Sequence, residues 1–244
     1  MNKYLLVVSK NYWGANTSEL TASKFIDKFT NVIGIQMGNV DSLIGDQVNV
    51  ASVKQILYSN VYKAMSINTD ITRPVVYVYM NGHGNQVFDT NGDENNFVLQ
   101  GETMKDNLDE IYQLPDGNIV DDEITDIIDK AVIDSGCKQR LLVVLISDHC
   151  SSGSMIDNKP VNYDWVTIGS SLDYQDSYIT GDGNVMTCNM LNIFDKYSKE
   201  IRLYTAGYFY KLLDEEMKAS FIGDMQLCTF HVSSESMFTE CLFK

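Results

Sequence analysis

Two apolar runs decide the fold class: Val75-Val76-Tyr77-Val78-Tyr79-Met80 and Leu141-Leu142-Val143-Val144-Leu145-Ile146. Continuous β-branched runs of this kind are typical of strands in a parallel sheet that is covered on both faces. Polar residues follow each run, Asn81-Gly82-His83-Gly84 after the first and Asp148-His149-Cys150-Ser151-Ser152-Gly153 after the second. Functional groups of an open α/β sheet collect at the carboxyl ends of its strands. The sequence therefore predicts an imidazole and a thiol at one edge of a buried sheet.

Strand and helix patterns alternate along the rest of the chain. Further strands are predicted over residues 4–9, 165–170 and about 226–232. Helical spacing of apolar residues follows two capping sequences, Asn16-Thr17-Ser18-Glu19 and Ser52-Val53-Lys54-Gln55, and recurs from Asp121 and over residues 185–197 and 203–219. Residues 81–120 are polar and are predicted to form a long functional loop, with a short strand near 97–99. The alternation predicts an α/β fold, a mostly parallel central sheet flanked by helices, in a single domain spanning residues 1–244.

Composition restricts the class of partner and the compartment. The chain has 244 residues and a formal net charge of -15, which argues against a nucleic-acid-binding surface. The charge fits an acidic surface, cation sites or a basic substrate, or simple solubility. The 5 Cys are odd in number and lack C-x-x-C spacing, so we expect neither a disulfide framework nor a zinc site, and a cytoplasmic, intracellular location. The apolar N-terminal run, residues 4–8, is too short for a signal peptide or a membrane span, so no membrane partner is expected.

The thiol and the imidazole suit nucleophilic catalysis. A cysteine attacks an amide carbonyl as its thiolate, which needs a nearby imidazole or another positive influence. Of the 3 His, His83 is the best partner for Cys150. The side chain of His149 is expected to point to the opposite face of an extended segment from Cys150, unless the backbone turns sharply there. His231 lies in an alternating late strand that indicates a structural role. Gly84 allows a close approach of a substrate, and its N–H is expected to form an oxyanion hole with that of Cys150. The alternative is that Cys150 is one more buried cysteine.

Several stretches together resemble one family of proteins. They are Tyr4-Leu5-Leu6-Val7-Val8-Ser9-Lys10-Asn11-Tyr12-Trp13-Gly14, Val76-Tyr77-Val78-Tyr79-Met80-Asn81-Gly82-His83-Gly84-Asn85-Gln86, Asp89-Thr90-Asn91-Gly92-Asp93-Glu94, Ile119-Val120-Asp121-Asp122-Glu123-Ile124 and Asp148-His149-Cys150-Ser151-Ser152-Gly153-Ser154. A weaker match is Asp173-Tyr174-Gln175-Asp176-Ser177. In order and spacing, these stretches resemble a type I metacaspase, a member of the caspase-like clan of cysteine peptidases.

The resemblance implies a caspase-like fold and a cysteine endopeptidase with a Cys150–His83 dyad. It also implies that Asn81 and Asp148 form the pocket for the P1 side chain of a protein or peptide substrate. An Asp at the floor of such a pocket would pair with an Arg or Lys side chain, so a basic P1 residue is expected.

The resemblance further implies a calcium ion that activates the enzyme without taking part in its chemistry. The ligands would be Asp121, Asp122 and Asp157, joined by Asp109. Calcium prefers several hard oxygen ligands, and carboxylates brought together need a cation. The alternative is that Asp121 and Asp122 only stabilise the first turn of a helix through their interaction with the helix dipole, and that Asp157 is solvated.

Departures from the family pattern leave rival functions open. Ser151 stands where the family has His, and Asn81 stands where it has Ser. The family's first-helix Asp, which helps to bind a basic P1 residue, is missing, with Asp27 one position off. The Ser151 and Asn81 departures motivate one rival, a catalytically silent caspase-like protein that binds partners. A legumain-like or transamidase-like enzyme is the other rival, although the Ile119–Glu123 and Asn85-Gln86 matches count against it. We expect a monomer without a prodomain.

Overall fold

The computed structural model describes residues 2–11, 17–66, 73–90, 97–99, 102–104, 107–156, 162–220 and 222–244, and only the backbone of 97–99, 102–104 and 224. Its central sheet has six strands in the order β13-β10-β9-β3-β1-β2. Neighbouring strands are parallel except at the edge, where β13 runs antiparallel to β10. The bounds are β1 (Lys3–Ser9), β2 (Val40–Ile44), β3 (Val75–Asn81), β9 (Leu141–Asp148), β10 (Tyr163–Gly169) and β13 (Thr229–Val232). The predicted α/β class with a mostly parallel sheet is thereby confirmed.

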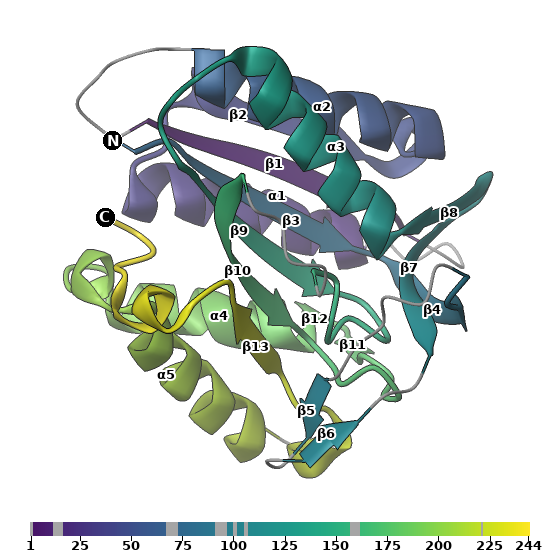
Figure 1. Cartoon of the computed structure of the whole chain (residues 1–244). Coiled ribbons are helices and arrows are strands. Elements are labelled where there is room, and N and C mark those ends of the chain that lie inside the picture. The colour runs from purple at the N-terminus through teal and green to yellow at the C-terminus, as the bar shows by residue number, and fades with distance from the viewer. Residues whose placement is uncertain are drawn as a thin grey trace.

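Helices cover both faces of this sheet (Figure 1). The helices α1 (Thr17–Lys28), α4 (Val185–Lys196) and α5 (Ala206–Ala219) pack on one face, and α2 (Val50–Ser66) and α3 (Asp121–Ser135) pack on the other. Successive side chains of a strand point to opposite faces of the sheet, so the apolar residues of each strand are shared between the two helical layers. In β1, Leu5 and Val7 join the core of the first face, while Leu6 and Val8 join the core of the second. Both faces of the strand are buried, which explains its uninterrupted apolar sequence.

Aromatic packing fixes β3, the strand that leads to the His motif. Helix α1 continues into a π-helical turn, Phe29–Ile33, which ends at Gly34 in the left-handed region with φ 79°. The ring of Phe25 stacks on Tyr79 at a centroid distance of 4.2 Å, and Phe29 meets Tyr77 edge-on at 5.1 Å. Because both tyrosines belong to β3, the helix holds the strand in place along its length. Aromatic pairs in these geometries add to the stabilisation from burial alone.

The prediction of a long loop over residues 81–120 is wrong, although the short strand expected near 97–99 is present as β5. Three strands in this segment, β4 (His83–Phe88), β7 (Leu108–Leu114) and β8 (Gly117–Val120), form an antiparallel sheet beyond the carboxyl ends of β3 and β9 (Figure 1). The segment also holds a hairpin of β5 (Phe97–Leu99) and β6 (Glu102–Met104). Strand β4 was missed because its sequence, HGNQVF, is mostly polar and it is only partly buried. Strand β4 is stabilised by its hydrogen-bonded pairing with β7, although its own sequence has no pattern of alternating apolar residues.

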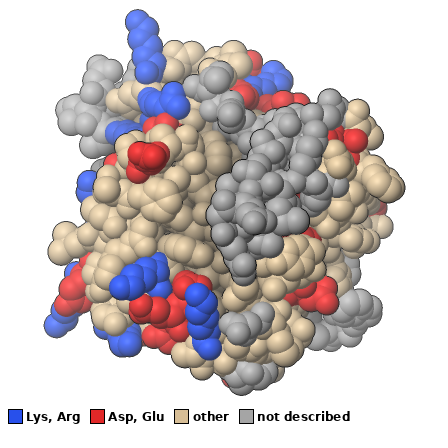
Figure 2. Space-filling view, turned by 60° about the horizontal axis from the view of Figure 1, so that its bottom comes forward, with Lys and Arg blue, Asp and Glu red and all other residues tan. Residues whose placement is uncertain are grey.

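The remaining elements are short. They are the strands β11 (Ile179–Thr180) and β12 (Gly183–Asn184) and the 3-10 helices Met37–Asn39, Gly45–Gln47, Ile201–Leu203, Gly223–Met225 and Glu235–Thr239. In the described part of the chain, no helix has the length and apolar character needed to cross a membrane. On the face shown in Figure 2, Lys and Arg side chains lie among acidic ones, and the described residues form no continuous basic patch there.

Candidate active site

The ends of β3 and β9 bring the two polar motifs together. These strands pair in parallel, and their last matched residues are Asn81 and Asp148. His83 then begins β4, and Cys150 follows the end of β9. A Cβ atom added to Gly84 would lie 2.0 Å from the Cys150 carbonyl oxygen. The His83-Gly84 segment therefore packs directly on the Cys150 segment, at the carboxyl edge of the sheet.

Cys150 is half-buried and its sulfur faces the chain at Ser177. The Ser177 N–H donates a hydrogen bond to Cys150 Sγ across 3.3 Å. Burial raises the pKa of the Cys150 thiol, the nearby Asp176 carboxylate raises it further, and the hydrogen bond from Ser177 opposes both. The N–H of Cys150 itself lies beside its sulfur and also lowers the thiol pKa. The balance favours the neutral thiol when no substrate is bound.

His83 is also held in its neutral form. It is the first residue of β4, where it pairs with Gln113 of β7. Burial lowers the pKa of the His83 imidazole below its usual range. A neutral thiol and a neutral imidazole are the components of a nucleophile–base pair, in which the thiol proton would pass to the imidazole during attack.

The two predicted P1-pocket residues lie below the surface. Asp148 is 0% exposed, and its carboxylate accepts hydrogen bonds from Ser177 Oγ at 3.1 Å and from the N–H and hydroxyl of Thr187 at 3.0 and 2.5 Å. Burial raises the pKa of Asp148, and these hydrogen bonds oppose the shift. Asn81 is also 0% exposed, and its amide donates to the Ser18 carbonyl oxygen at 3.1 Å. Both side chains are parts of a buried polar network in this conformation.

Three of the four predicted calcium ligands are described, and the sheet register brings them near one another. The pairing of β7 with β8 matches Ile111 with Val120, so Asp109 on β7 lies next to the first turn of α3, where Asp121 and Asp122 are. Asp109 and Asp121 are 7% and 1% exposed. The described residues contain no group of three or more His, Cys, Asp or Glu arranged to hold a metal ion.

Asp157, the fourth predicted ligand, lies outside the described residues. The loop that leads to it does reach β7, because Ser154 Oγ donates to the Glu110 carboxylate at 2.5 Å. Calcium binding therefore remains a prediction.

Sequence reasoning gave too little weight to the segment around Ser177. The Ser177 N–H contacts the Cys150 sulfur and its hydroxyl contacts Asp148, so one residue links the nucleophile to the buried acid. The Gln175 carbonyl oxygen accepts the N–H of Ser151 at 3.1 Å. Thr187 was not singled out at all, since it lies within the first turns of α4 with no motif around it. The weak match at Asp173–Ser177 was the available signal for the other two.

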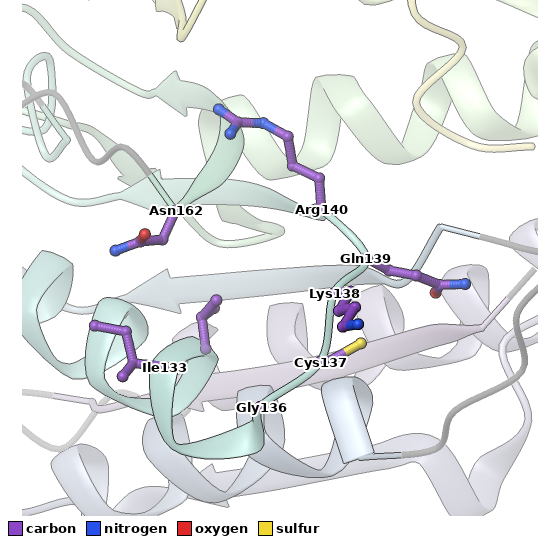
Figure 3. A pocket seen from close by; sticks show the side chains of 8 residues that line it. Ile133, Gly136, Cys137, Lys138, Gln139, Arg140 and Asn162 are labelled. Atoms are coloured by element: carbon purple, nitrogen blue, oxygen red, sulfur yellow. The ribbon is translucent and has the colours of Figure 1, made fainter.

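A separate cavity of about 480 Å³ lies at the opposite end of β9 from Cys150, near Cys137, Lys138 and Arg140 (Figure 3). Lys138 and Arg140 point in different directions in this view, and Arg140 is paired with Asp164. This cavity therefore offers no convergent set of polar groups.

The sequence matches no protein-family model and no curated protein. Among solved structures, the chain is similar to the crystal structure of protein GSU0716 from Geobacter sulfurreducens, a structural-genomics target, with a TM-score of 0.72 at 17% sequence identity. The match covers 100% of this chain and 99% of that chain. At this identity the likeness shows the fold alone, a mixed α/β architecture.

Proposed function

We propose that this protein is a caspase-like cysteine endopeptidase that uses Cys150 as nucleophile and His83 as general base. The observation that carries the proposal is the packing of the His83-Gly84 segment on the Cys150 segment at the ends of two paired strands. Two segments far apart in the sequence, one with an imidazole and one with a thiol, are thus neighbours, as a nucleophile–base pair would require. The pKa directions of both residues fit a neutral pair that is activated by substrate.

The proposed reaction proceeds through an acyl-enzyme. As Cys150 Sγ bonds to the scissile carbonyl carbon, the thiol proton passes to His83, and the carbonyl oxygen becomes an oxyanion held by the N–H groups of Gly84 and Cys150. His83 then gives its proton to the leaving amine as the C–N bond breaks. A water molecule loses a proton to His83 and attacks the thioester carbon, and the thiol is restored as the carboxylic acid leaves.

We propose cleavage after Arg or Lys, with Asp148 as the acid that the P1 side chain approaches and Asn81 beside it. Because both are buried, the pocket has to open on the side of Ser177 and Thr187 when substrate binds. A cationic side chain near Asp148 would favour the ionised carboxylate that burial disfavours. Calcium is proposed to bind Asp121, Asp122 and Asp157, joined by Asp109, and to stimulate the enzyme by shifting a population of conformations.

A peptide panel tests this proposal. Fluorogenic peptides that differ only at P1 are incubated with the protein, with and without millimolar calcium, and with the Cys150→Ala and His83→Ala variants as controls. Turnover after Arg or Lys that both substitutions abolish supports the proposed endopeptidase.

Two other outcomes lead to the rivals. Turnover after Asn or Asp favours a legumain-like or transamidase-like enzyme. The Asp176 carboxylate, which helps to raise the pKa of Cys150, is the observation that favours a silent partner-binding protein. Absence of turnover on every peptide would favour that function.

A further inference from the structure

His149, which the proposed reaction does not use, lies between the two catalytic segments. Its ring is 0% exposed and faces Tyr112 at a centroid distance of 5.5 Å. A Cβ atom added to Gly84 would lie 2.2 Å from its Nδ1 atom, so the ring fills the space that the glycine leaves. The imidazole therefore touches both the strand that carries His83 and the loop that carries Cys150.

The protonation of this ring is fixed by one contact. His149 Nδ1 lies 2.9 Å from the Cys150 carbonyl oxygen. Because a carbonyl oxygen can only accept, Nδ1 carries the proton and Nε2 keeps its lone pair. Within the described part of the chain, the buried Nε2 atom has no hydrogen-bond partner. A buried polar atom without a partner costs stability, and such a cost is typical of functional sites.

The contact with Nδ1 acts on a strained turn. Ser151 has a φ of 49°, in the left-handed region that residues with a side chain adopt rarely. The peptide group between Cys150 and Ser151 is clamped at both ends, since its carbonyl accepts from His149 and its N–H donates to Gln175. Strained backbone persists only where surrounding contacts enforce it.

We infer that His149 is a positioning residue for the nucleophile, and that its Nδ1–H bond to the Cys150 carbonyl aims the Cys150 sulfur and N–H at the substrate. This inference rests on the proposed peptidase reaction. A hydrogen bond at this atom fixes the rotation of the peptide that follows the nucleophile. The same ring supports Gly84, so one side chain sets the spacing between the nucleophile and the strand of the base.

The surroundings keep His149 in the required form. Burial lowers the pKa of His149 to about 4, the hydrogen bond to Cys150 opposes this shift, and nearby His83 adds to it. The titratable groups that face the ring are His83 from β4, Tyr112 from β7 and Cys150 from its own loop. The ring therefore stays neutral, with its proton on Nδ1, across the pH range in which His83 can act as a base.

Two isosteric substitutions separate positioning from bulk packing. The amide nitrogen of Asn can occupy the place of Nδ1, whereas that of Gln reaches the place of Nε2. We expect His149→Gln to lower kcat by roughly 10- to 100-fold with little change in KM, the scale for a displacement of about 1 Å in a catalytic group. His149→Asn should recover most of this loss. His231→Gln, which removes a partly buried imidazole at β13, is the control and should leave kcat near that of wild type.

Two measurements judge the inference even if no peptide is cleaved. The first is the rate at which iodoacetamide alkylates Cys150, followed by mass spectrometry. It should be similar in wild type and His149→Asn and several-fold slower in His149→Gln. The second is the ¹⁵N chemical shifts of the His149 imidazole in wild type, which should show the Nδ1–H tautomer.

The outcomes are distinguishable. Absence of turnover together with the expected alkylation order would overturn the proposed function and leave the positioning role standing. Equal alkylation rates in the Asn and Gln variants would overturn the positioning role, as would the Nε2–H tautomer. The tautomer measurement needs no variant, so it decides the matter if His149→Gln does not fold.

Discussion

Replacing Gly84 by Ala should disable the site through a single added methyl group. The new Cβ would lie 2.0 Å from the Cys150 carbonyl oxygen and 2.2 Å from His149 Nδ1, whereas ordinary contacts begin at 3.4 Å. One obstacle is backbone and the other is a buried ring, so neither can rotate away. The β4 strand or the Cys150 loop has to move by more than about 1 Å, and a shift of that size in a catalytic group costs on the order of 100-fold in rate.

The same clash should lower stability. Overpacking a filled site costs about 1–3 kcal/mol, and the backbone contact puts Gly84→Ala at the upper end. For a chain of this size, a loss of about 3 kcal/mol corresponds to a drop in Tm of roughly 6–12 °C. Calorimetry or circular dichroism measures the Tm, and the peptide assay measures kcat/KM.

Gly38→Ala is the matched control, because an added Cβ there would meet nothing within 4 Å. It should change neither quantity. If Gly84→Ala is as stable and as active as Gly38→Ala, the two segments are not packed together as described, and the dyad loses its geometric support.

Three further predictions address the buried acid, the calcium ligands and the pH dependence. Asp148→Asn should lower kcat/KM for an Arg substrate by an amount equivalent to roughly 2–4 kcal/mol of transition-state stabilisation, the scale for removing one partner of a buried charge pair. An unchanged preference for Arg would assign the pocket role to another acid, and Asp27 would be the first to test. Calcium should raise both activity and Tm in wild type and much less in Asp122→Ala, and magnesium should substitute poorly because it keeps a compact octahedral shell; identical titrations of the two proteins would place the site elsewhere. Because burial lowers the pKa of His149 from 6.5 to about 4, the folded state should lose about 3 kcal/mol of stability as the pH falls from 6.5 through 4. Denaturant unfolding at several pH values should show this loss in wild type and a smaller one in His149→Asn, and parallel pH profiles would contradict the assigned burial of the ring.

Local sequence predicted the positions of His83 and Cys150, because the apolar runs that mark the two preceding strands are patterns of neighbouring residues. The apolar runs 75–80 and 141–146 marked two buried strands, and the register between β3 and β9 then placed His83 and Cys150 at one edge. No local pattern could identify Thr187, whose hydroxyl reaches the Asp148 carboxylate from another helix. That contact joins residues distant in sequence, and only the packing of α4 against the sheet creates it.

The surroundings of Gly84 and Cys150 differ from what the sequence suggested. The sequence suggested that Gly84 leaves room for a substrate, whereas the space beside it is occupied by the protein's own Cys150 carbonyl and His149 ring. The sequence also predicted a cysteine activated as a thiolate. Burial and the Asp176 carboxylate instead raise the pKa of Cys150, which reflects a charge distribution that only the folded chain defines.

The sequence by itself determined the layered α/β architecture, because hydrophobic periodicity is a property of neighbouring residues and the buried strands of the central sheet carry it. It did not predict the edge strand β2, which is only partly buried and is paired with β1. The tertiary structure alone decided that β4, β7 and β8 form an antiparallel sheet, because polar strands such as β4 are stabilised by hydrogen bonds to partners elsewhere in the chain. It also decided the electrostatics of the edge where His83, His149 and Cys150 meet, because desolvation depends on what surrounds a side chain in space and not on what precedes it in the sequence.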